Sequence, residues 1–128
     1  MRILHTESSC GWGGQELRVI ADVQASAKRG HCVRICCHQE SLFKDRSYLP
    51  SELFLFSNIK RKSLGGLLSM NWEIWEYRPD LVITHSSTDS WLVAIVKHLI
   101  PRRFFIIRVR HVSAPISSRW PTRWLYQQ

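Results

Sequence analysis

The chain has 128 residues, 45% of them hydrophobic, which suffices for one globular domain with a buried core but not for two. Its formal net charge of +8 is one-sided, because residues 1–89 carry 11 basic and 10 acidic side chains whereas residues 90–128 carry 7 basic and none acidic. This field favours an anionic partner. No apolar run reaches the roughly 18 residues that span a bilayer, so we expect any membrane contact to be peripheral.

The cysteine content indicates a reducing environment. The chain has four cysteines, including the adjacent pair Cys36 and Cys37, and this usage is typical of intracellular proteins. A strand-like segment with polar and charged side chains follows Met1 at once, so we expect no secretory signal. The expected location is the cytoplasm, with the inner face of the membrane as the place of any peripheral contact.

Hydrophobic periodicity and turn residues predict strands that alternate with helices. The strands are expected at residues 2–6, 32–37, 53–56, 81–85 and 104–110. Helices are expected from about Leu17 to Lys28, from Leu67 to the turn at Pro79, from Trp91 to Leu99 and from Arg119 onward. Residues 63–66 are expected to be a loop, and residues 39–51 a loop with at most a turn of helix.

This alternation predicts an α/β fold with a Rossmann-like parallel sheet and helices on both faces. Ligands of such sheets bind outside the carboxyl ends of the strands. We therefore expect three distant stretches to meet at one edge of the sheet: residues 7–14, 85–89 and 111–113.

Residues 10–16, CGWGGQE, join the first strand to the first helix. A glycine turn before a helix presents backbone N–H groups and the positive end of the helix dipole, which suits phosphate. The dinucleotide pattern is incomplete, because Gly11 and Gly13 match its first two glycines but Glu16 stands at the third. No Gly-Lys-Ser/Thr follows, so a P-loop is excluded. Both a phosphate site and a plain tight turn fit these residues.

His111 and His85 each follow a predicted strand. A histidine at a strand end is more often structural than catalytic, but these two are expected at the same edge of the sheet as the glycine turn. Arg108 and Arg110 precede His111, and the alternation of a strand puts both on one face. The meeting of two histidines and the glycine turn at one edge of the sheet favours a functional site.

Two further patterns have simpler explanations. The segments 31–32 (His-Cys) and 36–38 (Cys-Cys-His) lack the Cys-x-x-Cys spacing of zinc sites. The strand period also puts Cys37 on the face opposite to Cys36 and His38, so we expect buried strand thiols at Cys32, Cys36 and Cys37 and no metal. Six tryptophans beside basic residues could stack on nucleic-acid bases. Trp72 and Trp75, with Trp91, fit apolar helix faces, so we expect core packing and no nucleic-acid partner.

Taken together, the motifs resemble one family. MRILHTESSCGWGGQELRVIADVQASAKRGHCVRI is similar to the opening of GT-B glycosyltransferases of the large retaining family four, especially enzymes that build lipopolysaccharide and other cell-envelope glycans. PDLVITHSSTDSWLVAI and FFIIRVRHVSAPI resemble its fourth and fifth strand regions, in order and at suitable separations. The resemblance covers almost the whole chain.

The resemblance implies roles for particular residues at the edge of the sheet. The backbone of Gly13 and Gly14 would approach the diphosphate of a nucleotide-sugar donor, and His111 would be the catalytic residue beside the transferred sugar. The cleft and its acceptor side would be lined by Trp12, Gln15, Glu16, His85, Ser86 and Ser87.

The resemblance also implies a division of labour. GT-B enzymes have two Rossmann-like domains, and residues 1–128 correspond to an incomplete N-terminal, acceptor-side domain without the nucleotide-sugar domain. We expect the 128-residue chain alone to be inactive, because stabilising the reacting centre requires groups on both sides of it. No cofactor is expected, since the nucleotide-sugar is a substrate, and the acceptor would be a glycan or a lipid-linked sugar. The alternative is a small basic protein that binds nucleic acid or an anionic membrane surface.

Overall fold

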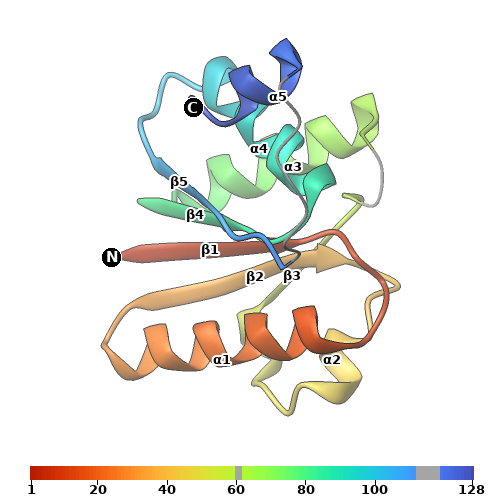
Figure 1. The fold of residues 1–128 in the computed structure, drawn as a ribbon. Coiled ribbons are helices and arrows are strands. Elements are labelled where there is room, and N and C mark those ends of the chain that lie inside the picture. The colour runs from red at the N-terminus through yellow and green to blue at the C-terminus, as the bar shows by residue number, and fades with distance from the viewer. Residues whose placement is uncertain (60–61, 112–118) are drawn as a thin grey trace.

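A computed structural model describes residues 1–59, 62–111 and 119–128 (Figure 1). The strands β1 to β5 form one fully parallel sheet in the order β3-β2-β1-β4-β5. Helices α1 and α2 lie on one face, and α3, α4 and α5 lie on the other (Figure 1). The elements are β1 Arg2–Glu7, α1 Gly14–Lys28, β2 Cys32–His38, α2 Phe43–Arg46, β3 Phe54–Ser57, α3 Leu64–Tyr77, β4 Leu81–Thr84, α4 Ser87–Leu99, β5 Phe105–Arg108 and α5 Trp120–Leu125. The predicted Rossmann-like fold is confirmed.

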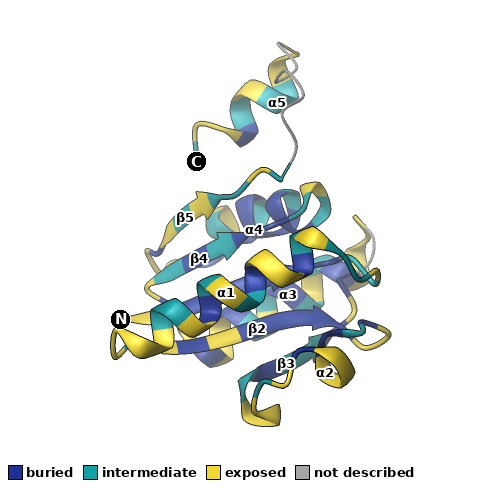
Figure 2. Ribbon diagram, turned by 60° about the horizontal axis from the view of Figure 1, so that its bottom comes forward, coloured by how far each residue is buried: buried dark blue, intermediate teal, exposed yellow. Residues whose placement is uncertain are grey.

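The core has one layer on each face of the sheet, because successive strand residues point to opposite faces. Leu4 and Cys36 pack in the layer beneath α3 and α4, whereas their neighbours Ile3 and Cys37 pack in the layer beneath α1. Both thiols are fully buried, which confirms the prediction of buried strand thiols for this pair, but the prediction is wrong for Cys32, which is exposed at the start of β2. Burial raises the pKa of Cys37 to about 12 and that of Cys36 well above its usual value, so neither ionises near neutral pH. Figure 2 shows β2 buried along most of its length.

The start of α3 differs from the prediction of a loop at residues 63–66. The helix begins at Leu64, so Gly65 and Gly66 lie in its first turn. The side chain of Ser63 caps the helix, because its Oγ accepts a hydrogen bond of 3.1 Å from the Gly66 N–H. Glycine is a poor helix former, so two glycines weaken the first turn of α3. The cap supports this turn, because it gives a hydrogen-bond partner to one of the backbone N–H groups that the start of a helix leaves without one. At the other end, Arg78 has a left-handed backbone with φ of 53°, and Pro79 follows, as predicted.

The prediction of core packing is wrong for Trp72 and Trp75. Their side chains are 62% and 51% exposed. The inward face of α3 is occupied instead by Gly66, Met70, Ile74 and Tyr77. Because α3 carries apolar residues on more than one face, periodicity alone did not identify the buried one. The third predicted core tryptophan, Trp91, is half-buried and stacks on Trp124 with ring centroids 5.7 Å apart.

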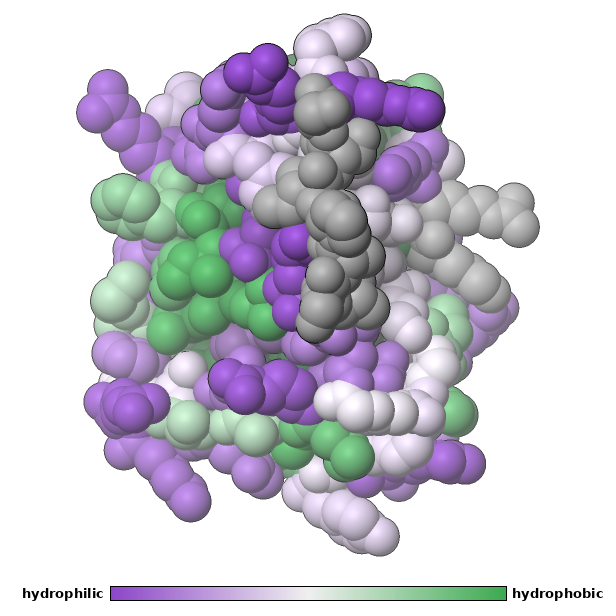
Figure 3. All heavy atoms as spheres, viewed as in Figure 1, coloured by the Kyte–Doolittle hydropathy of each residue, from purple (hydrophilic) through white to green (hydrophobic). Residues whose placement is uncertain are grey.

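The edge strand β5 leaves apolar side chains in contact with solvent. Phe105 is 76% exposed and Ile107 is 48% exposed, whereas Ile106 between them packs against the core on the side of α3 and α4. Figure 3 shows apolar side chains gathered on the face over β5. None of the described helices has the length and apolarity that crossing a bilayer requires.

Candidate functional site

The carboxyl ends of β1, β4 and β5 bring the predicted site residues to one edge of the sheet. The backbone N–H of His85 bonds to the carbonyl of Thr6, and that of Val109 bonds to the carbonyl of Thr84. These bonds place the residues that follow the strands side by side, with the loop after β1 next to the turn before α4. Of the predicted stretch 111–113, only His111 belongs to the described residues.

Three imidazoles form a continuous row at this edge. Nε2 of His85 lies 3.0 Å from Nδ1 of His5, and Nδ1 of His85 lies 3.2 Å from Nε2 of His111. His5 and His85 are buried, and His111 is partly exposed. The sequence analysis missed His5, because it lies inside a strand rather than at its end. Its signal was the strand period, which puts His5 and Glu7 on one face.

Burial keeps the two inner imidazoles neutral. Desolvation lowers the pKa of His5 to about 4, against a smaller opposing effect of Asp22. The pKa of His85 is lowered to about 3, by desolvation first and then by the neighbouring imidazoles of His5 and His111. At neutral pH, His5 and His85 are therefore neutral, and each carries hydrogen on one of its two ring nitrogens.

The surroundings of the three imidazoles favour one placement of their ring hydrogens. Nε2 of His5 is buried and has no partner among the described residues. A buried N–H without an acceptor is more costly than a bare acceptor nitrogen, so the hydrogen of His5 belongs on Nδ1. His5 then donates to Nε2 of His85, and Nδ1–H of His85 donates to Nε2 of His111. In neutral His111 the remaining hydrogen lies on Nδ1, the nitrogen outside the row.

Asp89 fixes the backbone of the turn before α4. Its carboxylate accepts hydrogen bonds from the Thr6 hydroxyl at 2.6 Å, the His85 N–H at 3.1 Å and the Ser86 hydroxyl. Asp89 is fully buried, and desolvation, followed by the charge of Glu7, raises its pKa to about 7. The carboxylate thereby links β1 to the turn that carries His85 and Ser86.

The glycine turn leads into α1 at the same edge. Gly13 is the N-cap residue, and a Cβ on Gly14 would meet no atom within 4 Å, so the backbone there is open to a ligand. Glu16 is buried, and its Oε2 would lie 3.7 Å from a Cβ on Gly13. The Gln15 amide donates to Glu7, whose pKa is raised mainly by burial. The turn is therefore partly covered at Gly13 and uncovered at Gly14.

A cavity of about 390 Å³ adjoins the row of imidazoles. It is lined by Gln15, His85, Ser86, Ser87, Ser90, Trp91, Arg108, Val109, Arg110, His111, Thr122, Leu125 and Tyr126. The predicted residues that it brings together are Gln15, His85, Ser86, Ser87 and His111. Arg108 also lines it, although the sequence analysis assigned this residue no role. None of the described lining residues is acidic, so the cavity suits a neutral or anionic ligand.

The other predicted residues lie outside this lining. Gly13, Gly14 and Glu16 belong to the turn beside the cavity, with Gln15 between the two places. Trp12 points elsewhere: its ring packs edge-on against Phe43 of α2, with centroids 6.2 Å apart. An apolar ring next to a buried hydrophobic layer is more stable there than at a polar cavity, so Trp12 anchors the turn to the core.

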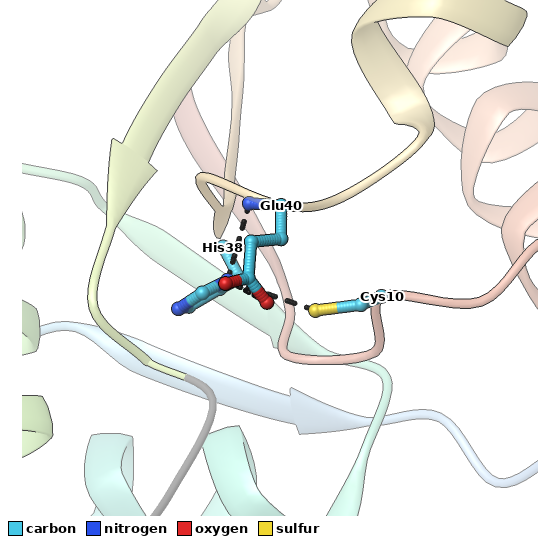
Figure 4. Close-up of side chains that lie close together, drawn as sticks. All are labelled: Cys10, His38 and Glu40. Atoms are coloured by element: carbon cyan, nitrogen blue, oxygen red, sulfur yellow. Dashed lines mark hydrogen bonds and ion pairs between the residues drawn. The ribbon is translucent and has the colours of Figure 1, made fainter.

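Figure 4 shows a second group of polar side chains, on the loop after β1 and the end of β2. One ligand atom from each of Cys10, His38 and Glu40 lies within 4.8 Å of the others. Nδ1 of His38 is 3.6 Å from the Cys10 sulfur and also accepts the Glu40 N–H at 3.2 Å. It is 3.9 Å from the Glu40 carboxylate, beyond the roughly 3.4 Å between nitrogen and oxygen ligands of tetrahedral zinc. Glu40 would have to move before the three could hold an ion. The expectation that the chain binds no metal therefore stays a prediction.

Comparisons with known proteins identify the fold of the chain. No curated protein matches it. Three solved structures of Anabaena Alr3699/HepE have a similar fold. The complex with UDP-glucose has a TM-score of 0.61 and 18% identity, and the match covers 91% of this chain and 30% of that one. The complex with UDP has a TM-score of 0.58 and 19% identity, over 83% and 29% of the two chains. The chain thus spans less than a third of the length of these structures.

The family comparison extends to nearly all of the sequence. Residues 12–128 match the model of glycosyltransferase family 4. The match includes the glycine turn, His85 and His111, so the residues that the resemblance singled out lie within it. The chain belongs to glycosyltransferase family 4.

Proposed function

We propose that the chain is the acceptor-side, N-terminal part of a glycosyltransferase that moves a sugar from a nucleotide-sugar to a cell-envelope glycan, such as lipopolysaccharide, or to a lipid-linked acceptor. The observation that carries this proposal is the meeting of the open Gly14 backbone and the His111 imidazole at one edge of the sheet, beside one cavity. Family membership and the UDP-glucose complex of Alr3699/HepE support it.

In this proposal, the positive end of α1 approaches the diphosphate of the donor through the backbone of Gly13 and Gly14. His111 is the catalytic residue beside the transferred sugar. Its Nε2 accepts from His85, so its Nδ1–H is available to donate to a sugar oxygen. Ser86 and Ser87 hold the acceptor, Gln15 and Glu16 flank the cleft, and Trp12 supports the turn from behind.

We further propose that a donor-binding domain complements residues 1–128. The chain spans 30% of Alr3699/HepE, and the apolar face of β5 is uncovered in the described residues, as expected of a surface on which further elements pack. Sugar transfer by the 128-residue chain alone should then be undetectable, because groups on the donor side of the reacting centre are needed as well.

Donor binding by the chain tests the proposal. We expect UDP-glucose to bind weakly, with a Kd of about 1 mM or above, because half of the cleft is supplied elsewhere. His111→Gln should weaken this binding. The matched control is His31→Gln, because His31 lies before β2, at the opposite end of the sheet. Binding that is unaffected by His111→Gln, or equally weakened by both changes, would refute the proposal.

A second feature supports peripheral contact with an anionic membrane on the cytoplasmic side. Exposed apolar side chains follow one face of α3 at helical spacing: Leu64, Leu68, Trp72 and Trp75. Exposed basic residues lie beyond its two ends, with Lys62 before the helix and Arg78 and Arg102 past it. An apolar strip with basic ends suits an interface between lipid tails and anionic headgroups.

Vesicle sedimentation tests this contact. Trp72→Ser with Trp75→Ser should reduce binding to phosphatidylglycerol vesicles, and neutral phosphatidylcholine vesicles should bind less than anionic ones. If binding depends on charge alone and the tryptophans contribute nothing, the membrane proposal fails. Steeply salt-dependent binding to an oligonucleotide would instead support the alternative of a nucleic-acid-binding protein.

A further inference from the structure

We propose that Arg108 forms a binding site for an oxyanion, a phosphate or carboxylate carried by the acceptor, in the cavity beside His85 and His111. The proposal rests on the proposed function only for the identity of the molecule that carries the oxyanion. The binding site itself follows from the surroundings of the guanidinium group.

The guanidinium group of Arg108 lacks the partners that a buried cation requires. Its Nε and Nη2 are buried and have no hydrogen-bond partner among the described residues. The guanidinium group lies over the ring of Tyr126, whose centroid is 5.9 Å from Cζ. A cation over an aromatic ring gains some electrostatic energy, but its N–H donors stay unsatisfied. A partly buried charge without a counter-ion among the described residues is costly, and two of its nitrogens are buried without a partner, so Arg108 is the kind of group that a bound anion would complete.

The remainder of the cavity is compatible with an anion. Arg110 also lines it, and no described lining residue is a carboxylate. Desolvation lowers the pKa of Arg108, as expected of a cation without an anionic neighbour. Asp89, the chain neighbour of the lining residue Ser90, is fully buried and already bonded to Thr6 and to the turn before α4. A ligand in the cavity would therefore meet positive charge and hydroxyl groups, which is the combination that a phosphorylated or acidic sugar requires.

The position of Arg108 separates this site from the proposed donor phosphate. Gly13 and Gly14 do not line the cavity, whereas Ser86 and Ser87 do. The side chain of Gln15 lies between the two places and donates to Glu7. An oxyanion bound to Arg108 would thus lie on the side of the acceptor residues. We therefore expect the acceptor to be anionic near the hydroxyl group that receives the sugar.

The planar shape of the guanidinium group allows a test that compares arginine with lysine. Arginine can hold two oxygens of one phosphate or carboxylate in a planar fork, whereas lysine offers a single charged point. Arg108→Lys should therefore bind an anion less tightly than the unchanged chain, and Arg108→Gln should bind it least. Arg29→Gln is the matched control, because Arg29 is exposed at the C-cap of α1, at the other end of the sheet from the cavity.

The experiment titrates inorganic phosphate into the 128-residue chain at constant ionic strength, maintained with chloride, and records the ring signals of Tyr126 and His111 by NMR. We expect saturable shifts. Arg108→Gln should weaken binding by about tenfold or more, as the loss of hydrogen bonds to a charged group predicts, and Arg29→Gln should leave it unchanged. Without phosphate, the Arg108→Gln chain should melt close to the unchanged chain, because the lost contact with the Tyr126 ring is offset by the removal of a partly buried charge without a counter-ion.

A separate titration with UDP tests whether the oxyanion bound at Arg108 belongs to the acceptor or to the donor. The proposal requires that Arg108→Gln leave UDP affinity unchanged and that UDP and phosphate bind together. Phosphate binding that is insensitive to Arg108→Gln would overturn the oxyanion site. Competition between UDP and phosphate at Arg108 would overturn its assignment to the acceptor. If UDP does not bind but phosphate binding depends on Arg108, the donor proposal fails while the oxyanion site stands.

Discussion

The imidazoles of His85 and His111 are 3.2 Å apart, from Nδ1 of the first to Nε2 of the second, and the other nitrogen of His85 is 3.0 Å from His5. His85 thus connects a fully buried residue of β1 to a partly exposed residue at the cavity. It can set the tautomer of His111 without contacting a substrate itself. In the proposed function, His85 would therefore position His111, and this role can be tested separately from catalysis.

The tautomer of His111 should depend on His85. We predict that neutral His111 carries its hydrogen on Nδ1, because Nε2 accepts from His85. In His85→Phe this acceptor role is lost, and the Nε2–H form of His111 should become populated. Long-range ¹⁵N–¹H correlation spectra distinguish the two forms. His31→Gln should not change them, and an Nε2–H tautomer in the unchanged chain would show that the inferred direction of the row is wrong.

Acid should destabilise the fold through the two inner imidazoles. His5 and His85 have pKa values of about 4 and about 3 in the folded chain, below their usual value of 6.5. The unfolded chain therefore binds more protons between pH 6.5 and 4, so stability is complete above 6.5 and falls as the pH drops. Each group contributes up to about 1.4 kcal/mol per pH unit. Urea unfolding at pH 5 and 7 should show a smaller difference for His85→Gln than for the unchanged chain.

Asp89 should have the opposite pH dependence. Its pKa is raised from 3.8 to about 7, so the folded chain holds an extra proton between these values and loses that stabilisation as the pH rises through 7. Asp89→Asn removes the titration and keeps the size of the side chain. The free energy of unfolding of Asp89→Asn, relative to the unchanged chain, should therefore be more favourable at pH 8 than at pH 5. A difference that is independent of pH would show that Asp89 stays ionised in the fold.

The cysteines should divide into two pairs by reactivity. Cys36 and Cys37 are fully buried with raised pKa values, whereas Cys32 is exposed and Cys10 is partly exposed. Because the thiolate is the reactive form, a maleimide should label Cys10 and Cys32 rapidly and the buried pair only on unfolding. Peptide mass spectrometry after brief labelling measures this order. Rapid labelling of Cys37 in the folded chain would contradict the two-layer core.

Substitutions on α3 should distinguish its two faces. Ile74 is fully buried and Trp72 is 62% exposed, although both fit the same apolar pattern. Ile74→Ala should cost about 2–5 kcal/mol of unfolding free energy, the usual cost of removing buried methylene groups. Trp72→Ser should change it by about 0.5 kcal/mol or less, as a surface substitution does. Chemical denaturation measures both values, and a larger cost for Trp72→Ser would require the helix to be rotated.

The sequence predicted the fold because its signals are local and repeated. Strands alternate with helices along the chain, as where Leu81–Thr84 is followed by the apolar helix Ser87–Leu99, and this alternation is compatible with few topologies. The start of α3 was misplaced because Gly65 and Gly66 disfavour a helix, while the cap that compensates for them, Ser63, is a single common residue. Tertiary packing decides whether a segment with two glycines begins a helix, and the sequence pattern does not show that packing.

The sequence predicted which side chains meet at the ends of strands, but it did not single out those inside strands. His85 and His111 follow strands, so the rule for parallel sheets placed them together before any distance was known. His5 and Arg108 lie within strands, where alternation assigns a face but not the neighbour opposite. Only the register of β1 against β4, and of β4 against β5, brings these side chains into the row and the cavity.

Mapping UDP-glucose on the backbone amides of the chain tests the proposed site most directly. We predict that titration shifts the amide signals of Gly13 and Gly14 together with the His111 ring signals, and leaves Gly30, at the far end of α1, unmoved. Shifts confined to other parts of the chain, or movement at Gly30 without movement at Gly14, would show that the carboxyl edge of this sheet does not receive a nucleotide-sugar.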